Sequence, residues 1–166
     1  MARLTRDDMR GKAQTVLGLI DPAALGTTLM HEHLLWNITP PALRTKGPLP
    51  ELPLNQWWNL ANSYTTSERN TTQIDPAAAV GAVAEVIQYG GSTIVELTIG
   101  GLCPDPNGLV QVARETGAHI VMGCGHYVQD YQDPANADRS IDELTLEMIA
   151  QVQEGAWGTD LSLIHI

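Results

Sequence analysis

Two histidines, His31 and His33, most constrain what this chain can fold into. They stand near the end of residues 28–34, a short apolar stretch that we expect to form a buried strand. Side chains alternate between the faces of a strand, so both histidines point to one side and Glu32 points to the other. Two imidazoles on one rigid face are typical of half a metal site. The alternative is a pair of core histidines, because a bare His-x-His motif is weak.

Strands and helices are expected to alternate along the rest of the chain. Two further apolar strands are predicted at 92–98 and 118–124. Three helices, each opened by a capping residue, are predicted at 77–89, 107–116 and 141–153. This order predicts parallel strands joined by right-handed crossovers. An open doubly wound sheet and a (β/α)8 barrel both fit, and histidines at a strand end favour the barrel.

The regions around the first strand are less regular. Residues 13–20 are expected to form a small hairpin with residues 26–28, across a turn at 21–24. Residues 37–54 contain five prolines and are expected to form a long surface loop, either functional or a tolerated insertion. A short helix is predicted over 55–63, and residues 1–12 are expected to be a polar arm.

Composition limits the partners and the compartment. The formal net charge of -10 disfavours nucleic acid and anionic membranes, which bind basic surfaces. The sequence has no apolar run of transmembrane length and no signal peptide. Cys103 and Cys124 are predicted to be free thiols in a reducing compartment. We therefore expect a cytoplasmic globular protein with no nucleic-acid or membrane partner.

Four stretches of the sequence together resemble the phosphotriesterase family of the amidohydrolase superfamily. They are residues 15–18, 26–34, 91–98 and 118–127. The likeness extends over residues 13–160. It implies a (β/α)8 barrel with a binuclear metal centre, usually zinc, with cobalt or manganese as alternatives. It also implies hydrolysis of a lactone, carboxylic ester or phosphotriester through a hydroxide that bridges the two metals.

The resemblance also assigns roles to individual residues. It implies that His31 and His33 are ligands of the more buried metal, and that Tyr127 lies beside the metals and the substrate pocket. The alternative for Tyr127 is a rim aromatic with no chemical role. The resemblance gives no ligand role to His126 and no role to Glu96, which lies within a strand.

Other residues of the family's site have no counterpart in this sequence. These are a bridging residue on the fourth strand, usually a carboxylated lysine, two histidines on the fifth and sixth strands, and an aspartate on the eighth. A catalytic zinc normally has three protein ligands, so the chain as given is expected to be inactive. The alternative is a non-catalytic barrel fragment, or an α/β module that binds a ligand or a partner.

The length of the chain adds a further expectation. A (β/α)8 barrel takes roughly 250 residues, whereas this sequence has 166. Residues 161–166 match the translation of a transposon-end adapter used in sequencing libraries, and a natural short fourth strand is the alternative. We therefore expect residues 1–160 to be the N-terminal portion of a metal-dependent hydrolase, with three to four strand–helix units, and residues 161–166 to be a non-native tail. The complete enzyme would act on a small ester, lactone or organophosphate, and a homodimer is compatible with the resemblance.

Overall fold

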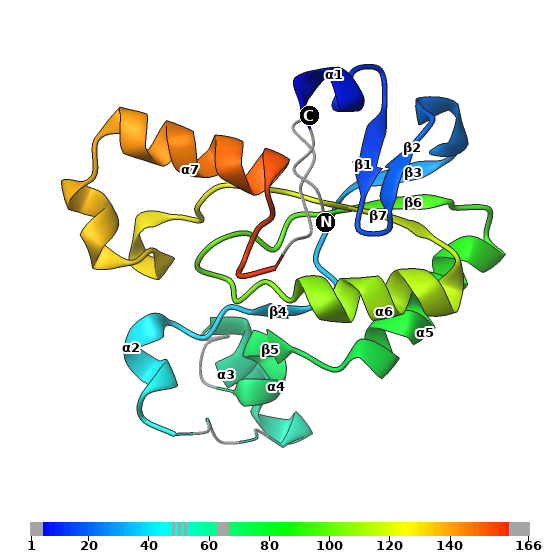
Figure 1. The fold of residues 1–166 in the computed structure, drawn as a ribbon. Coiled ribbons are helices and arrows are strands. Elements are labelled where there is room, and N and C mark those ends of the chain that lie inside the picture. The colour runs from blue at the N-terminus through cyan, green and yellow to red at the C-terminus, as the bar shows by residue number, and fades with distance from the viewer. Residues whose placement is uncertain (1–4, 48, 50, 52, 63–66, 160–166) are drawn as a thin grey trace.

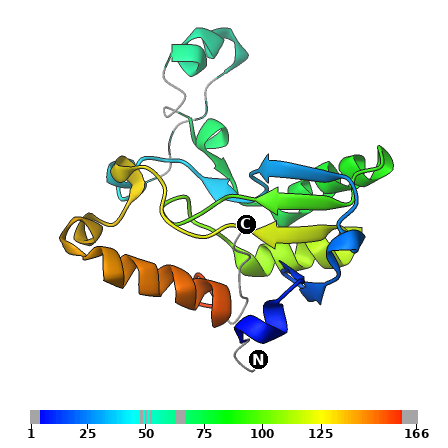
Figure 2. The same cartoon turned by 90° about the horizontal axis from the view of Figure 1, so that it is seen from above.

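The computed structural model describes residues 5–47, 49, 51, 53–62 and 67–159. A parallel sheet lies at its centre, with its strands in the order β3 (Thr28–Glu32), β6 (Thr93–Glu96) and β7 (His119–Met122). The helices α5 (Pro76–Gln88) and α6 (Pro106–Thr116) pack together beside the sheet (Figures 1 and 2). The prediction of an α/β fold with parallel strand–helix units is confirmed.

The two central helices begin and end where their flanking residues predict. The Asp75 carboxylate accepts a hydrogen bond from the Ala77 amide, and the Asp105 carboxylate accepts one from the Gly108 amide. Each cap is followed by proline, whose fixed φ suits the first helical position. The helix α6 ends at Gly117, whose φ of +75° is a left-handed conformation that glycine adopts without strain.

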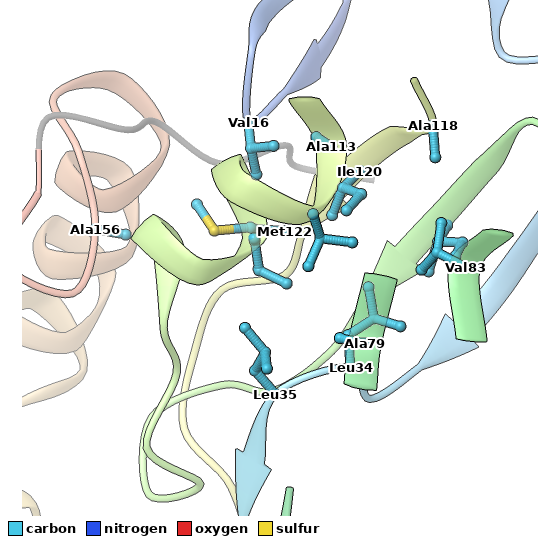
Figure 3. Packing of buried hydrophobic residues seen from close by; sticks show 13 residues of the cluster. Val16, Leu34, Leu35, Ala79, Val83, Ala113, Ala118, Ile120, Met122 and Ala156 are labelled. Atoms are coloured by element: carbon cyan, nitrogen blue, oxygen red, sulfur yellow. The ribbon is translucent and has the colours of Figure 1, made fainter. Parts of the chain in front are cut away.

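The hydrophobic core lies between the sheet and these two helices (Figure 3). Ile94 of β6 and Ile120 of β7 pack with Val83 of α5 and Val112 of α6, and all four side chains are almost fully buried. Apolar burial of this kind is the main favourable contribution to folding. It holds the helices against the sheet and so fixes the position of the strand ends.

The prediction of a buried first strand is wrong for β3. The side chains of Leu29 and Met30 are 38% and 57% exposed. Within the described residues β3 pairs only with β6, so it lies at an edge of the sheet (Figure 2). The strand β6 has a neighbour on both sides and is buried along its whole length. The strand β7 lies at the other edge but is mostly buried, because residues 13–16 lie against it and the Val16 amide donates a hydrogen bond to the Ile120 carbonyl.

The predicted hairpin is also wrong in its pairing. The strand β1 (Ala13–Thr15) pairs antiparallel with β2 (Gly18–Ile20) rather than with residues 26–28. The turn is therefore only two residues long, and Gly18 follows it with a φ of +119°. Asp21 instead caps a short helix, η1 (Pro22–Ala24). The sequence carries two turn signals close together, and the tighter turn prevails.

Residues 37–54 are less irregular than predicted. In the described part of the chain between β3 and α5, six short elements are present, and they are β4 (Trp36–Asn37), α2 (Pro41–Arg44), η2 (Leu54–Gln56), α3 (Trp57–Asn62), α4 (Glu68–Thr71) and β5 (Thr72–Gln73). The strands β4 and β5 form an antiparallel pair, which the sequence analysis missed because each strand has only two residues. The predicted helix over 55–63 is present as η2 and α3, within the described residues.

The remaining elements lie near the two ends of the chain. They are α1 (Arg6–Met9), η4 (Gln129–Tyr131), η5 (Pro134–Asp138) and α7 (Ile141–Gln153). The helix α1 lies within the expected polar arm, and the capping box of Thr5 and Asp8 stabilises its start. The helix α7 begins with the predicted capping box of Ser140 and Glu143. Among the described helices, none is long and apolar enough to cross a membrane.

Candidate metal site

His31 and His33 lie at the carboxyl end of the parallel sheet. His31 is the second-to-last residue of β3, and His33 follows the strand directly. Their ring centroids are 5.4 Å apart, with 67° between the ring planes. Both residues keep solvent-accessible surface. The strand therefore brings two imidazoles side by side at the edge where parallel α/β proteins bind their ligands.

A bulge in β3 lies directly at His31. Leu29 pairs with Ile94 and Glu32 pairs with Glu96, so β3 has one more residue than β6 between these pairs. Met30 and His31 therefore stand opposite Val95 alone. A bulge bends its strand locally and changes the direction of a side chain, and bulges are enriched next to active sites.

The His33 ring is bound to the end of the neighbouring strand. Its Nδ1 lies 3.1 Å from the Thr98 hydroxyl oxygen. The Thr98 hydroxyl in turn donates a hydrogen bond to Oε1 of Glu96. Glu96 is only 2% exposed. A continuous hydrogen-bonded chain therefore runs from the buried carboxyl group of β6 to the imidazole that follows β3.

Glu96 also holds the backbone around the site. Its Oε1 accepts a hydrogen bond from the Leu34 amide and its Oε2 accepts one from the Thr98 amide, both at 3.1 Å. Burial raises the pKa of Glu96 above its ordinary value, and the hydrogen bonds from Thr98 and Leu34 act in the opposite direction. This side chain therefore joins the two segments that follow β3 and β6.

Electrostatics favour the neutral form of His33. Partial burial lowers its pKa, and the neighbouring His31 imidazole lowers it further, because two imidazolium ions would repel each other. The Glu32 carboxylate acts in the opposite direction with a smaller effect. A neutral imidazole has a free lone pair, which a metal ligand requires.

Tyr127 lies in the loop that follows β7. Its amide donates a hydrogen bond to the Gly100 carbonyl at 2.8 Å, so the loops after β6 and β7 run together. Its ring is 37% exposed and packs edge-to-face on Tyr131, with the ring centroids 5.4 Å apart. The Tyr131 hydroxyl donates to the Ile38 carbonyl at 2.9 Å. Tyr127 is thus at the same end of the sheet as the histidines, but its ring contacts Tyr131 rather than either imidazole.

The other two histidines described here lie in separate environments. His126 Nε2 is 3.5 Å from Oε1 of Glu147, and His126 Nδ1 is 3.3 Å from the side-chain nitrogen of Asn136. His126 therefore belongs to a polar cluster between the loop after β7 and α7. His119 begins β7 and pairs with Thr93 at the opposite end of the sheet. The structure brings neither of them to the His31–His33 pair.

The donor set fits part of a metal site. No group of three or more His, Cys, Asp or Glu residues that could hold a metal is present among the described residues. His31 and His33 supply two imidazoles, and the contact of His33 Nδ1 with Thr98 leaves Nε2 of that ring for a metal. These two imidazole nitrogens are ligands of the kind that zinc prefers.

Thr98 and Glu96 are residues around the site to which the sequence analysis gave no role. The signal that could have found them is a Glu-x-Thr pair at the carboxyl end of the second predicted strand. Alternation places two such residues on one face, and a parallel neighbour places them beside the first strand. His33 and Thr98 are 65 positions apart in the sequence, so their proximity is not visible from the sequence alone.

Comparisons with known proteins identify the family of the chain. The model of the phosphotriesterase family matches residues 11–164. The N-acetyltaurine hydrolase of Mus musculus is 36% identical over 92% of this chain and 46% of its own length. The chain therefore spans about half the length of the curated relatives that it matches.

Solved structures show the same fold. A resiniferatoxin-binding protein from Rhodobacter sphaeroides has a TM-score of 0.79 and 31% identity, covering 92% of this chain and 44% of that one. The organophosphorus hydrolase from Deinococcus radiodurans has a TM-score of 0.64 and 25% identity, with 92% and 42% coverage. The prediction that the strand–helix units form part of a (β/α)8 barrel is confirmed. The chain belongs to the phosphotriesterase family.

Proposed function

We propose that His31 and His33 are two ligands of the metal centre of a metal-dependent hydrolase. The observation that carries this proposal is the 5.4 Å separation of the two rings at the carboxyl end of the sheet. Zinc is the metal that best suits paired imidazoles, and cobalt and manganese are the alternatives. A bound divalent metal supplies Lewis acidity, which activates water and polarises a carbonyl or phosphoryl oxygen.

The residues of this chain have distinct tasks in the proposed site. The two imidazoles bind the metal as neutral rings, and the lowered pKa of His33 favours this neutral form. The bulge at Met30 and His31 and the hydrogen bond between His33 and Thr98 orient them. Tyr127, partly exposed on the neighbouring loop, borders the substrate and excludes water from one side.

We further propose that the remaining ligands come from a segment that this sequence does not include. The support is that the chain spans 46% of the length of the N-acetyltaurine hydrolase of Mus musculus. Two imidazoles leave a zinc ion mostly hydrated, whereas catalytic zinc sites normally have three protein ligands. The 166-residue chain alone is therefore expected to bind metal weakly and to turn over no substrate. The competing proposal is a non-catalytic fragment that binds a ligand or partner.

The bond that is cleaved has two candidates. The first is an ester bond, in a lactone, a carboxylic ester or a phosphotriester, as the family resemblance implies. The second is the amide bond of an N-acylated amine such as N-acetyltaurine. The 36% identity to an N-acetyltaurine hydrolase favours this second candidate. Both reactions need an activated water and a polarised oxygen, so the same metal ligands serve either one.

An activity panel on two proteins tests this proposal. The genomic sequence beyond codon 160 gives the complete reading frame, and both its product and the 166-residue chain are purified with zinc, cobalt or manganese. The expected result is metal-dependent hydrolysis of at least one lactone, aryl ester, aryl phosphotriester or N-acetyltaurine by the complete product alone. A complete, metal-loaded product that hydrolyses none of them contradicts the proposal. Turnover by the short chain, lost in the His31→Ala/His33→Ala variant, would mean that this sequence supplies every ligand it needs.

A further inference from the structure

The position of the proton on His33 follows from the contacts of Thr98. A neutral imidazole carries its proton on one nitrogen only, and the bond made by the other nitrogen decides which one binds a metal. In this structure Nδ1 of His33 lies 3.1 Å from the Thr98 hydroxyl. The question is therefore which of these two groups donates the hydrogen.

The donors directed at the carboxyl group of Glu96 decide the direction of the bond between His33 and Thr98. Oε1 of Glu96 accepts from the Leu34 amide and from the Thr98 hydroxyl, and its Oε2 accepts from the Thr98 amide. With donors directed at both of its oxygens, the carboxyl group is the acceptor in each of these bonds. The single hydroxyl hydrogen of Thr98 is therefore taken by Glu96, so that the Thr98 oxygen has only lone pairs to offer to His33.

We propose that Thr98, held by Glu96, is a positioning residue that fixes His33 as the Nδ1–H tautomer and turns its Nε2 lone pair toward the metal. Nδ1–H of His33 donates to the Thr98 oxygen, and the Thr98 hydroxyl donates to Glu96. The tautomer depends only on the described side chains. The step from Nε2 to a metal rests on the proposed function.

Hydrogen bonds of this kind to metal-binding histidines fix the ring and its tautomer, and their loss weakens metal binding by about 10- to 100-fold. The polar groups along this chain are shielded, because Glu96 is 2% exposed and Thr98 is 3% exposed. Water therefore competes poorly for the contacts that orient the ring.

The tautomer is tested first, without metal. Long-range proton–nitrogen NMR correlations of the neutral histidines report which ring nitrogen carries the proton, and the His33 signal is assigned by its loss in His33→Asn. We expect a protonated Nδ1 in the wild-type protein and in Thr98→Ser, which keeps the hydroxyl. In Thr98→Val we expect a mixture of tautomers. A protonated Nε2 in the wild type, or an unchanged tautomer in Thr98→Val, overturns the proposal.

The metal step is tested by zinc titration of the same variants, made in the product of the complete reading frame. We expect the zinc dissociation constant to rise by about 10- to 100-fold in Thr98→Val, and to stay near the wild-type value in Thr98→Ser. The matched control is Thr93→Val, since Thr93 is equally buried in β6 but donates its hydroxyl to the Leu25 carbonyl. Thr93→Val should leave zinc binding unchanged.

The outcomes separate this inference from the proposed function. Zinc that binds the wild type and Thr98→Val equally well refutes the role of Thr98 and leaves His31 and His33 as ligands. A wild-type protein that binds no zinc refutes the metal site, and the NMR result then decides the tautomer alone. A Thr93→Val variant that loses as much affinity as Thr98→Val shows a general loss of packing and refutes a specific role for Thr98.

Discussion

The Thr98 hydroxyl lies 3.1 Å from Nδ1 of His33, although the two residues are 65 positions apart in the sequence. Each follows a strand of the parallel pair β3–β6, which aligns Glu32 with Glu96. Strand pairing therefore brings the imidazole and its hydrogen-bond partner together before any ligand binds. Sites supported in this way by rigid elements hold their geometry better than sites built on loops alone.

The core that positions these strands gives the first prediction. Leu109 of α6 is 2% exposed and packs in the core cluster. Leu109→Ala removes its apolar contacts and leaves a cavity, so the free energy of unfolding should fall by about 2–5 kcal/mol. Leu146→Ala on α7 is the matched control, because Leu146 is 65% exposed. Urea unfolding measures both, and equal losses in the two variants would contradict this view of the core.

The second prediction concerns the pH dependence of stability. Burial raises the pKa of folded Glu96 above its ordinary value of 4.5, so between the two pKa values the folded state binds more protons than the unfolded state. The stability that this group contributes is full below pH 4.5 and is lost as the pH rises through the folded pKa.

Glu96→Gln removes this titration. We therefore expect the difference in unfolding free energy, wild type minus Glu96→Gln, to fall as the pH rises above 4.5 and then to level off. Urea unfolding of both proteins across this pH range measures the difference. A difference that grows with rising pH would show that the folded protein lowers the pKa of Glu96 instead.

The third prediction concerns the loops that border the site. Gly101 has a φ of +103°, and a Cβ built there would lie 2.7 Å from the Tyr131 carbonyl oxygen. Gly101→Ala should therefore force the loops after β6 and β7 apart. Gly117→Ala is the control, since it has a φ of +75° but nothing within 4 Å of its Cβ.

Thermal unfolding distinguishes the two glycine variants. Backbone strain of this kind costs of order 1–3 kcal/mol in either variant, and only Gly101→Ala adds the collision with Tyr131. Its melting temperature should fall further than that of Gly117→Ala, with a change in the near-ultraviolet circular dichroism of the tyrosines. Equal melting temperatures would mean that the two loops separate without loss of stability.

Much of the fold could be predicted from local signals. Asp75, Asp105 and Ser140 marked the starts of the three long helices, because a capping side chain acts on amides within its own first turn. Alternation along β3 placed His31 and His33 side by side for the same local reason. Features of this kind depend on neighbours in sequence and are visible in a single chain.

The rest depended on contacts between distant segments. The bulge at His31 appears only when β3 is paired with β6, and the exposure of Leu29 follows from the edge position of β3. Glu96 seemed an unassigned strand residue, because its partners Leu34 and Thr98 are gathered by the tertiary fold. The ring of Tyr127 was expected beside the metals, and its contact with Tyr131 could not be inferred from the sequence.

The measurement that tests the account most directly is the zinc content of the product of the complete reading frame, purified and dialysed against a zinc buffer. We predict that His31→Ala and His33→Ala each lose bound zinc, because the two rings share one ion. The matched control is His119→Ala, at the opposite end of the sheet, which should keep the wild-type zinc content. Full zinc occupancy in both His31→Ala and His33→Ala would contradict the assignment of these histidines as metal ligands.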